Sequence, residues 1–155
     1  MSIYVVDDHP MMRDGTAMMM RRLQPHRKVV ELRCLAELVP SADATGPPGL
    51  IVLDLNLPDA VGCSGVRRVK RQFSHVPLAV YSASPADDME ADCIEAGADV
   101  YIEKTAGASE LVAALRSLLF DIPLCSLRLA RDQGRRRIAS IAEVMGPHGS
   151  HPISG

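Results

Sequence analysis

Short apolar runs alternate with segments of helical periodicity along most of the chain. Five of these runs are rich in aliphatic and β-branched residues, as expected of strands that are covered on both faces. The runs are Ile3–Val6, Val29–Leu32, Leu50–Leu55, Leu78–Ser82 and Val100–Ile102. Unbroken runs of this kind are typical of a parallel sheet that is enclosed by helices.

The segments between the runs carry apolar residues at the spacing of one helix face. The apolar stripes are Met12, Thr16, Met19 and Leu23, then Val66, Val69 and Phe73, and finally Leu111, Leu115, Leu118 and Leu119. The acidic segment 87–95 is predicted to form a mostly solvated helix that ends at Gly97. Residues 35–50 have the weakest pattern, because Pro40 and the Gly/Pro cluster at 46–49 leave room only for a short helix and a loop.

Five strand–helix repeats within residues 1–120 predict an α/β fold, a doubly wound five-stranded parallel sheet with right-handed crossovers. The chain has 155 residues and is 47% apolar, which is enough for one buried core. Ligands of such folds bind at the carboxyl ends of the strands. The residues that follow each strand are therefore the candidates for chemistry.

These strand ends carry three carboxylates, a hydroxyl and an ammonium. Asp7 and Asp8 follow the first strand, Asp54 the third, Ser82 ends the fourth, and Lys104 follows the fifth. Carboxylates gathered in one pocket repel one another unless a cation lies among them, and hard oxygen ligands suit Mg²⁺. With its charge neutralised in this way, Asp54 would be able to attack phosphorus and form an acyl phosphate. Lys104 and Ser82 would then hold phosphoryl oxygens.

Composition narrows the classes of function. With 17 basic and 19 acidic side chains the net charge is -2, which argues against a general polyanion binder. No apolar run reaches the roughly 18 residues that cross a bilayer, and the N-terminus has no basic secretory region. We therefore expect no membrane segment and a cytoplasmic location. Two Phe, three Tyr and no Trp do not favour a platform for base stacking.

The cysteines and one histidine are weak candidates for chemistry. The four cysteines lie far apart without a CxxC pair, so we interpret them as small buried residues or stray thiols, and not as a zinc site or a disulfide framework. Cys63 follows Asp54 in a loop, with no base near it in the sequence. His9 follows the acidic pair, but Met12 stands where the cobalamin-binding motif DxHxxG requires glycine, so we assign it no ligand role.

These residues resemble the receiver domain of two-component response regulators, from about Ile3 to Phe120. Four stretches carry the resemblance: the acidic pair Asp7-Asp8, the loop Asp54-Leu55-Asn56-Leu57-Pro58 with Gly62, the segment Tyr81-Ser82-Ala83, and the block Glu95–Tyr101 followed by Lys104. The opening VDDHPMMRDG is most similar to regulators that carry a C-terminal helix-turn-helix of the NarL/LuxR type. Thr105 departs from the pattern, because many members have proline there.

The resemblance implies a flavodoxin/CheY-like fold with strand order 2-1-3-4-5 and a role as a phosphorylatable switch. Asp54 would accept a phosphoryl group from a histidine kinase or a phosphotransfer protein. Asp8, Asp54 and the backbone carbonyl of Asn56 would bind Mg²⁺ directly, and Asp7 would act mainly through water.

The resemblance also implies how the signal leaves the site. Ser82 and Lys104 would hold the phosphoryl group, and Tyr101 would turn inward as Ser82 is drawn toward the phosphate. The change would bias a two-state equilibrium of the face made by the fourth helix, the fifth strand and the fifth helix. Such domains commonly form homodimers or meet partners through that face.

Residues 121–155 do not fit a receiver domain. Basic side chains gather there, namely Arg128, Arg131, Arg135, Arg136 and Arg137. We expect a basic tail with a short helix near 137–145 and a disordered end, without a complete output domain and without direct DNA binding. A truncated regulator, a remnant of a lost output domain and a stand-alone receiver all agree with this pattern. The cognate kinase, the stimulus and the output pathway leave no mark in the sequence.

Two other functions compete with the phosphorylatable switch. One is a transcriptional regulator whose DNA-binding part is truncated. The other is a Mg²⁺-dependent phosphohydrolase of the haloacid dehalogenase type, which also uses an aspartate nucleophile. That family requires a second aspartate two residues after the nucleophile, where this chain has Asn56. We therefore expect no enzyme, beyond slow self-catalysed phosphorylation and dephosphorylation.

Overall fold

Five parallel strands form the central sheet in the order β2-β1-β3-β6-β7. The computed structural model describes residues 1–120. The strands of this sheet are β1 (Ser2–Val6), β2 (Val29–Leu32), β3 (Pro48–Leu53), β6 (Leu78–Ser82) and β7 (Val100–Glu103). Two short strands, β4 (Asn56–Leu57) and β5 (Ala60–Val61), pair with each other outside the sheet. The five strands of the main sheet confirm the predicted order 2-1-3-4-5.

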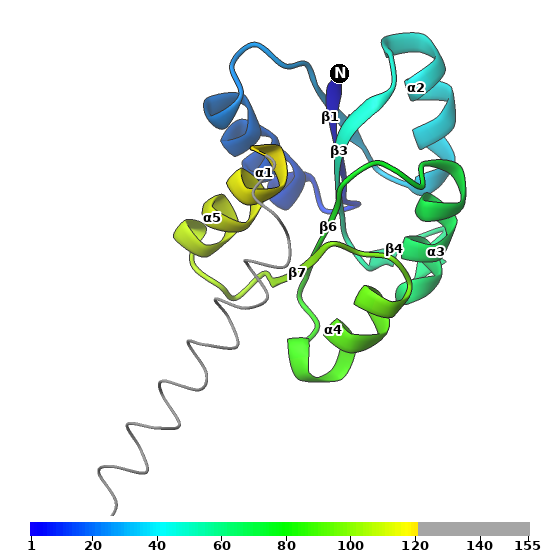
Figure 1. The fold of residues 1–155 in the computed structure, drawn as a ribbon, viewed down its shortest axis with the longest axis vertical. Coiled ribbons are helices and arrows are strands. Elements are labelled where there is room, and N and C mark those ends of the chain that lie inside the picture. The colour runs from blue at the N-terminus through cyan, green and yellow to red at the C-terminus, as the bar shows by residue number, and fades with distance from the viewer. Residues whose placement is uncertain (121–155) are drawn as a thin grey trace, which may run out of the picture. The chain divides into compact units, whose positions relative to one another are not determined.

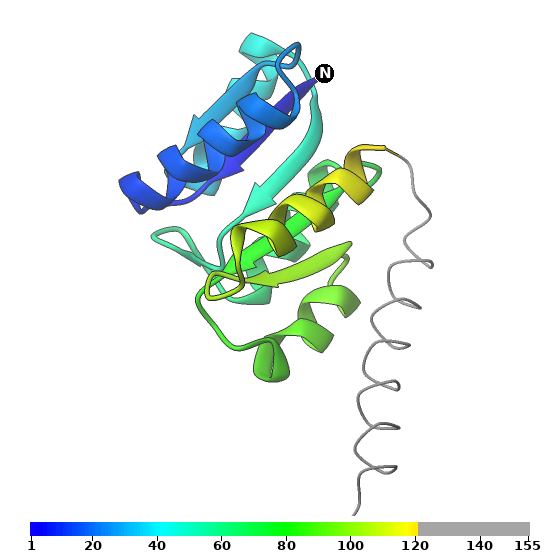
Figure 2. The same cartoon turned by 90° about the vertical axis from the view of Figure 1, so that its left-hand side faces the viewer.

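Helices cover both faces of the sheet. They are α1 (Pro10–Leu23), the 3₁₀ helix η1 (Leu35–Glu37), α2 (Leu38–Thr45), α3 (Cys63–Gln72), α4 (Ala86–Glu95) and α5 (Ala108–Leu119). Helices α1 and α5 lie on one face, and α2, α3 and α4 lie on the other (Figure 1). Figure 2 shows α1 and α5 side by side on their face. This arrangement confirms the doubly wound α/β fold.

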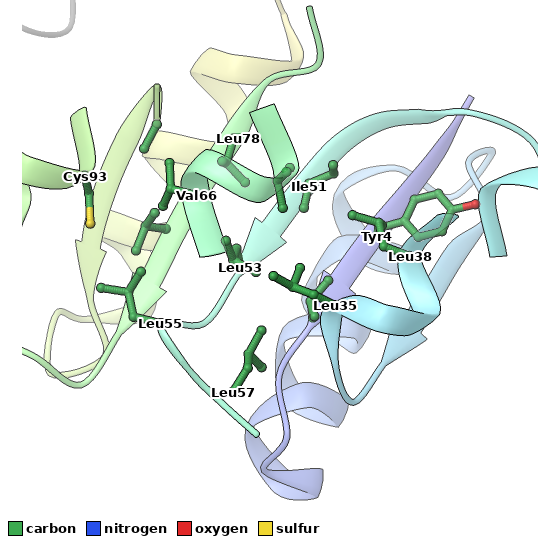
Figure 3. Packing of buried hydrophobic residues seen from close by; sticks show 14 of the residues in the cluster. Tyr4, Leu35, Leu38, Ile51, Leu53, Leu55, Leu57, Val66, Leu78 and Cys93 are labelled. Carbon is green, nitrogen blue, oxygen red and sulfur yellow. The ribbon is translucent and has the colours of Figure 1, made fainter. Parts of the chain in front are cut away.

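One core cluster lies between the sheet and the helices α2, α3 and α4, while α1 and α5 bury further apolar side chains such as Met20 and Leu115 on the other face (Figure 1). Leu53 and Leu55 pack there with Val66 of α3 and Cys93 of α4 (Figure 3). All four are at most 2% exposed, because the helices on this face cover the apolar side chains that the sheet presents to them. Burying such side chains supplies the main stabilisation of the fold.

The segment with the weakest sequence pattern is more regular than predicted. Residues 35–45 form η1 and then α2, and Pro40 lies in the first turn of α2, where a missing N–H breaks no helical hydrogen bond. Strand β3 begins at Pro48, inside the cluster that the pattern assigned to a loop. Proline is compatible with the first residue of a strand. The buried Tyr4 hydroxyl fixes the end of α2 by donating to the Gly46 carbonyl, at 2.8 Å.

The predictions for the C-terminal tail, including the helix near 137–145, the basic residues and the disordered end, lie outside the described residues. Within residues 1–120, no helix is both long enough and apolar enough to span a membrane.

Candidate functional site

Three strand ends bring Asp7, Asp54 and Lys104 together at the carboxyl edge of the sheet. Lys104 Nζ lies 2.9 Å from Asp7 Oδ2 and 3.4 Å from Asp54 Oδ2. Each side chain follows directly after β1, β3 or β7, so the parallel order of the sheet places them side by side. The two carboxylates are buried, at 3% exposure each. The structure thus places these three residues as the sequence predicted.

The backbone holds these positions rigidly, because the hydrogen-bond ladder continues one residue beyond each strand. The Asp7 N–H donates to Leu32 O at 3.0 Å, and the Asp54 N–H donates to Val6 O at 2.9 Å. The Lys104 N–H donates to Ser82 O at 2.7 Å. The side chains therefore leave fixed backbone, as a preorganised site requires.

The loop after Asp54 is tied down by its own contacts. The short β4–β5 pair closes it, and the Gly62 N–H donates to Leu55 O at 2.9 Å. Gly62 has φ +63, in the left-handed region that favours glycine. The Asp59 carboxylate accepts hydrogen bonds from the N–H groups of Leu35 and Ala36 at the start of η1. Asn56, the first residue of β4, is exposed and pairs with Val61.

The charges in the pocket change one another's proton affinity. Burial raises the pKa of Asp54; the Lys104 charge opposes this rise and the Asp7 charge adds to it. Burial alone would lower the pKa of Lys104, but the hydrogen bond to Asp7 and the charge of Asp54 outweigh it and leave this pKa above its ordinary value. Lys104 is therefore a fixed positive charge between two carboxylates.

His9 also reaches the pocket, which the sequence analysis did not anticipate. His9 Nδ1 lies 2.9 Å from Asp8 Oδ1 and 4.0 Å from Asp54 Oδ2. Asp7, Asp8, His9 and Asp54 each offer one ligand atom, and these atoms lie within 4.8 Å of one another. The position of His9, directly after an acidic pair at a strand end, was the signal for this.

The residues fit a divalent cation. Asp54 is buried, and neither of its carboxylate oxygens makes a well-formed hydrogen bond among residues 1–120, since the contact of Oδ2 with Lys104 Nζ is a long ion pair of 3.4 Å. Buried polar atoms are rarely left unpaired, and such an orphan calls for an explanation. Three carboxylates with one nearby cation leave excess negative charge, and hard oxygen donors of this kind suit Mg²⁺.

Ser82 and Tyr101 lie next to the pocket and contact the loop that leads to α4. Ser82 is fully buried, and its Oγ accepts a hydrogen bond from the Ser84 N–H at 3.2 Å. Tyr101 is buried as well, and its hydroxyl donates to the Ser84 carbonyl at 2.8 Å. Burial raises the pKa of the Tyr101 hydroxyl above its ordinary value. The Tyr101 ring is thus already buried in this structure, and its inward turn on phosphorylation stays a prediction.

Comparison with known proteins agrees with this geometry. The family model "Response regulator receiver domain" matches residues 3–116. The KDP operon transcriptional regulatory protein KdpE of Escherichia coli K12 is 45% identical over 76 residues, which cover 49% of this chain and 33% of KdpE. Response regulator UvrY of the same strain is 25% identical over 117 residues, which cover 76% of this chain and 53% of UvrY.

A solved structure of a response regulator has a similar fold. A two-component response regulator of the LuxR family from an Aurantimonas species superimposes with a TM-score of 0.68 at 25% identity, covering 85% of this chain and 96% of that chain. This chain spans about a third to a half of the length of the two curated relatives. Because the family model matches most of the chain and the acidic pocket lies at the expected sheet edge, the chain belongs to the receiver domain family of two-component response regulators.

Proposed function

We propose that Asp54 accepts a phosphoryl group from a histidine kinase or phosphotransfer protein, so that the chain acts as a phosphorylatable switch. The observation that carries the proposal is the buried Asp54 carboxylate, which makes no well-formed hydrogen bond among residues 1–120 and pairs with Lys104 only at 3.4 Å. Its raised pKa reflects an under-solvated carboxylate, which is a better nucleophile than a fully hydrated one.

The transfer balances as a displacement at phosphorus. One Asp54 oxygen forms a bond to phosphorus, and the bond from phosphorus to the histidine nitrogen of the donor breaks. The electron pair of that bond stays on the ring nitrogen. Lys104 pairs with one phosphoryl oxygen, and the Ser82 hydroxyl donates to another. The product is an acyl phosphate on Asp54.

We assign Mg²⁺ to this pocket, with Asp8, Asp54 and the Asn56 backbone carbonyl as direct ligands and Asp7 acting through water. The acidic cluster and the orphaned oxygens of Asp54 support this assignment. A bound cation would neutralise the carboxylates and the incoming phosphoryl charge.

The contacts of Ser84 suggest how the signal would spread. If the Ser82 hydroxyl turns to the phosphoryl group, the hydrogen bond that it accepts from the Ser84 N–H is lost. The Ser84 carbonyl holds Tyr101, so the loop between β6 and α4 and the Tyr101 ring move together. The face made by α4, β7 and α5 would change, and a homodimer would form through that face.

Intact-mass measurement after incubation with Mg²⁺ and acetyl phosphate tests the proposal. The wild-type chain is expected to gain one labile phosphoryl group, and Asp54→Asn none. Asp59→Asn is the matched control, because Asp59 lies in the same loop but contacts η1 and not the pocket. Equal labelling of wild type and Asp54→Asn would overturn the assignment. Phosphate release over many cycles would instead favour a phosphohydrolase.

Sedimentation over a concentration series, with and without a phosphoryl mimic, tests the homodimer. An unchanged monomer in both conditions would contradict it.

Transcriptional control is the second candidate function, because the KdpE relative is named as a transcriptional regulatory protein. We place the switch in the cytoplasm, where histidine kinases present their phosphoryl groups.

A further inference from the structure

Two cysteines that are far apart in the sequence meet on the face of the sheet covered by α3 and α4. Cys63 is the first residue of α3 and Cys93 lies in α4. Their sulfur atoms are 3.0 Å apart, within hydrogen-bond distance. Cys34, the third cysteine within residues 1–120, is a free thiol as well and provides an internal comparison.

The two thiols differ in access. Cys63 is partly exposed, whereas Cys93 is fully buried among core residues that include Leu55 and Val66 (Figure 3). Burial raises the pKa of Cys93 to about 12, and the hydrogen bond with Cys63 adds to this rise. One sulfur can therefore meet a reagent from solvent, and the other can react only with its neighbour.

We propose that Cys63 and Cys93 form a dithiol–disulfide modification site that is oxidised by low-molecular-weight disulfides such as oxidised glutathione. The Cys63 sulfur, as thiolate, attacks one sulfur of the reagent and releases one glutathione thiolate. The Cys93 sulfur then attacks the Cys63 sulfur, the bond from Cys63 to the second glutathione breaks, and that leaving thiolate takes up the proton of the buried Cys93 thiol. Two protein thiols are oxidised by two electrons, and one small disulfide is reduced to two thiols.

The separation of the two sulfur atoms is already close to that in a disulfide. A disulfide bond is about 2.05 Å long, so the sulfur atoms need to approach by about 1 Å from their separation of 3.0 Å. Both residues lie on helices that pack on the same face of the sheet (Figure 1). The bond would therefore join two secondary-structure elements that are already in place.

The link would restrain the element that the proposed switch moves. Cys93 lies in α4, the helix that begins just after the loop whose Ser84 carbonyl accepts the hydrogen bond of Tyr101. Tyr101 and Cys93 also share the same core cluster. A covalent bond from α3 to α4 would thus hold α4 beside Tyr101. This consequence rests on the proposed function, whereas the bond itself does not.

Peptide mass mapping without reductant tests the site on the full chain. After equilibration with a series of oxidised and reduced glutathione mixtures, the wild type is expected to lose two hydrogen atoms and give a linked Cys63–Cys93 peptide. Cys63→Ser changes a partly exposed residue and should abolish the link. Cys34→Ser is the matched control and should keep it. Four free thiols, a lasting glutathione adduct on Cys63, or links to Cys34 or Cys125 would overturn the proposal.

Hydrogen exchange tests whether the disulfide restrains α4, independently of whether the disulfide forms. In the linked form, amides of α4 are expected to exchange several-fold more slowly than in the reduced form. Unchanged exchange in a fully linked sample would overturn the restraint of α4. Phosphoryl uptake by the reduced chain tests Asp54 separately, so failure of that function and failure of the thiol site give different results.

Discussion

The Glu103 carboxylate at the end of β7 accepts a hydrogen bond from the backbone N–H of Ala86, the first residue of α4, with 2.7 Å between oxygen and nitrogen. Helix α4 has Pro85 at its N-cap position, and no side chain at that position caps it. The strand next to the pocket therefore supplies the cap of the helix on the proposed signalling face.

Replacing Glu103 with alanine should remove this cap. We expect Glu103→Ala to lower the free energy of unfolding by about 1 kcal/mol, because an orphan N–H at the helix N-terminus loses its acceptor. Glu103→Gln keeps an oxygen acceptor and should lose less. Urea unfolding followed by circular dichroism measures both variants. Equal losses for alanine and glutamine would mean that the hydrogen bond is not the stabilising feature.

Replacing Asp54 with asparagine should stabilise the metal-free protein. A buried carboxylate near Asp7 costs free energy, and the amide removes that charge with little change of shape. We expect the free energy of unfolding to rise by about 0.5–2 kcal/mol. Thermal unfolding of Asp54→Asn, with the exposed Asp43→Asn as control, gives the measurement. A less stable Asp54→Asn would show that the negative charge of Asp54 is already compensated in the pocket without a bound cation.

The stability difference between wild type and Asp54→Asn should depend on pH. The pKa of Asp54 is higher in the folded chain than in the unfolded chain, so folding favours the protonated acid. Its contribution to stability is present below the unfolded pKa and is lost as pH rises through the folded pKa. The advantage of Asp54→Asn should therefore shrink as pH falls from neutral toward the ordinary range of an aspartate. Urea midpoints of both proteins at several pH values, without divalent ions, measure it. A constant difference would exclude this titration.

Removing the Lys104 charge should strengthen metal binding. The ammonium lies 2.9 Å from Asp7 and 3.4 Å from Asp54, so it competes with a cation for the same carboxylates. We expect Lys104→Gln to lower the Kd for Mg²⁺ by about tenfold. Calorimetric titration measures the Kd, and Lys28→Gln is the control because Lys28 is exposed and lies just before β2, at the amino ends of the strands. Weaker Mg²⁺ binding by Lys104→Gln would mean that the lysine organises the ligands.

The strands were the part of the fold that the sequence predicted best. The runs Val29–Leu32 and Leu78–Ser82 match their strands to the residue. Strand β6 is almost fully buried and leaves a continuous apolar signal, whereas the edge strand β2 is only partly buried and includes Glu31. The structure of residues 35–50 was harder to predict, because a proline disrupts a helix or a strand only in its interior. Pro40 lies instead in the first turn of α2, and Pro48 is the first residue of β3. Both occupy positions where a missing N–H costs little, and only the tertiary fold reveals that.

The pocket was predictable to the extent that it follows from strand ends. Asp7, Asp54 and Lys104 each follow a strand, so the parallel topology alone brings them together. The approach of His9 to this cluster depends on the turn into α1, which a sequence pattern does not describe. The meeting of Cys63 and Cys93 depends on how α3 and α4 pack, and no local pattern carries that information.

The contact between Lys104 and Asp7 joins residues that are 97 positions apart. Strands β1 and β7 do not pair with each other, because β3 and β6 lie between them in the sheet. The pocket is therefore complete only when almost the whole described chain has reached its final topology. A nascent or partly unfolded chain presents Asp54 without its neighbours, so only fully folded molecules could compete for a phosphoryl donor.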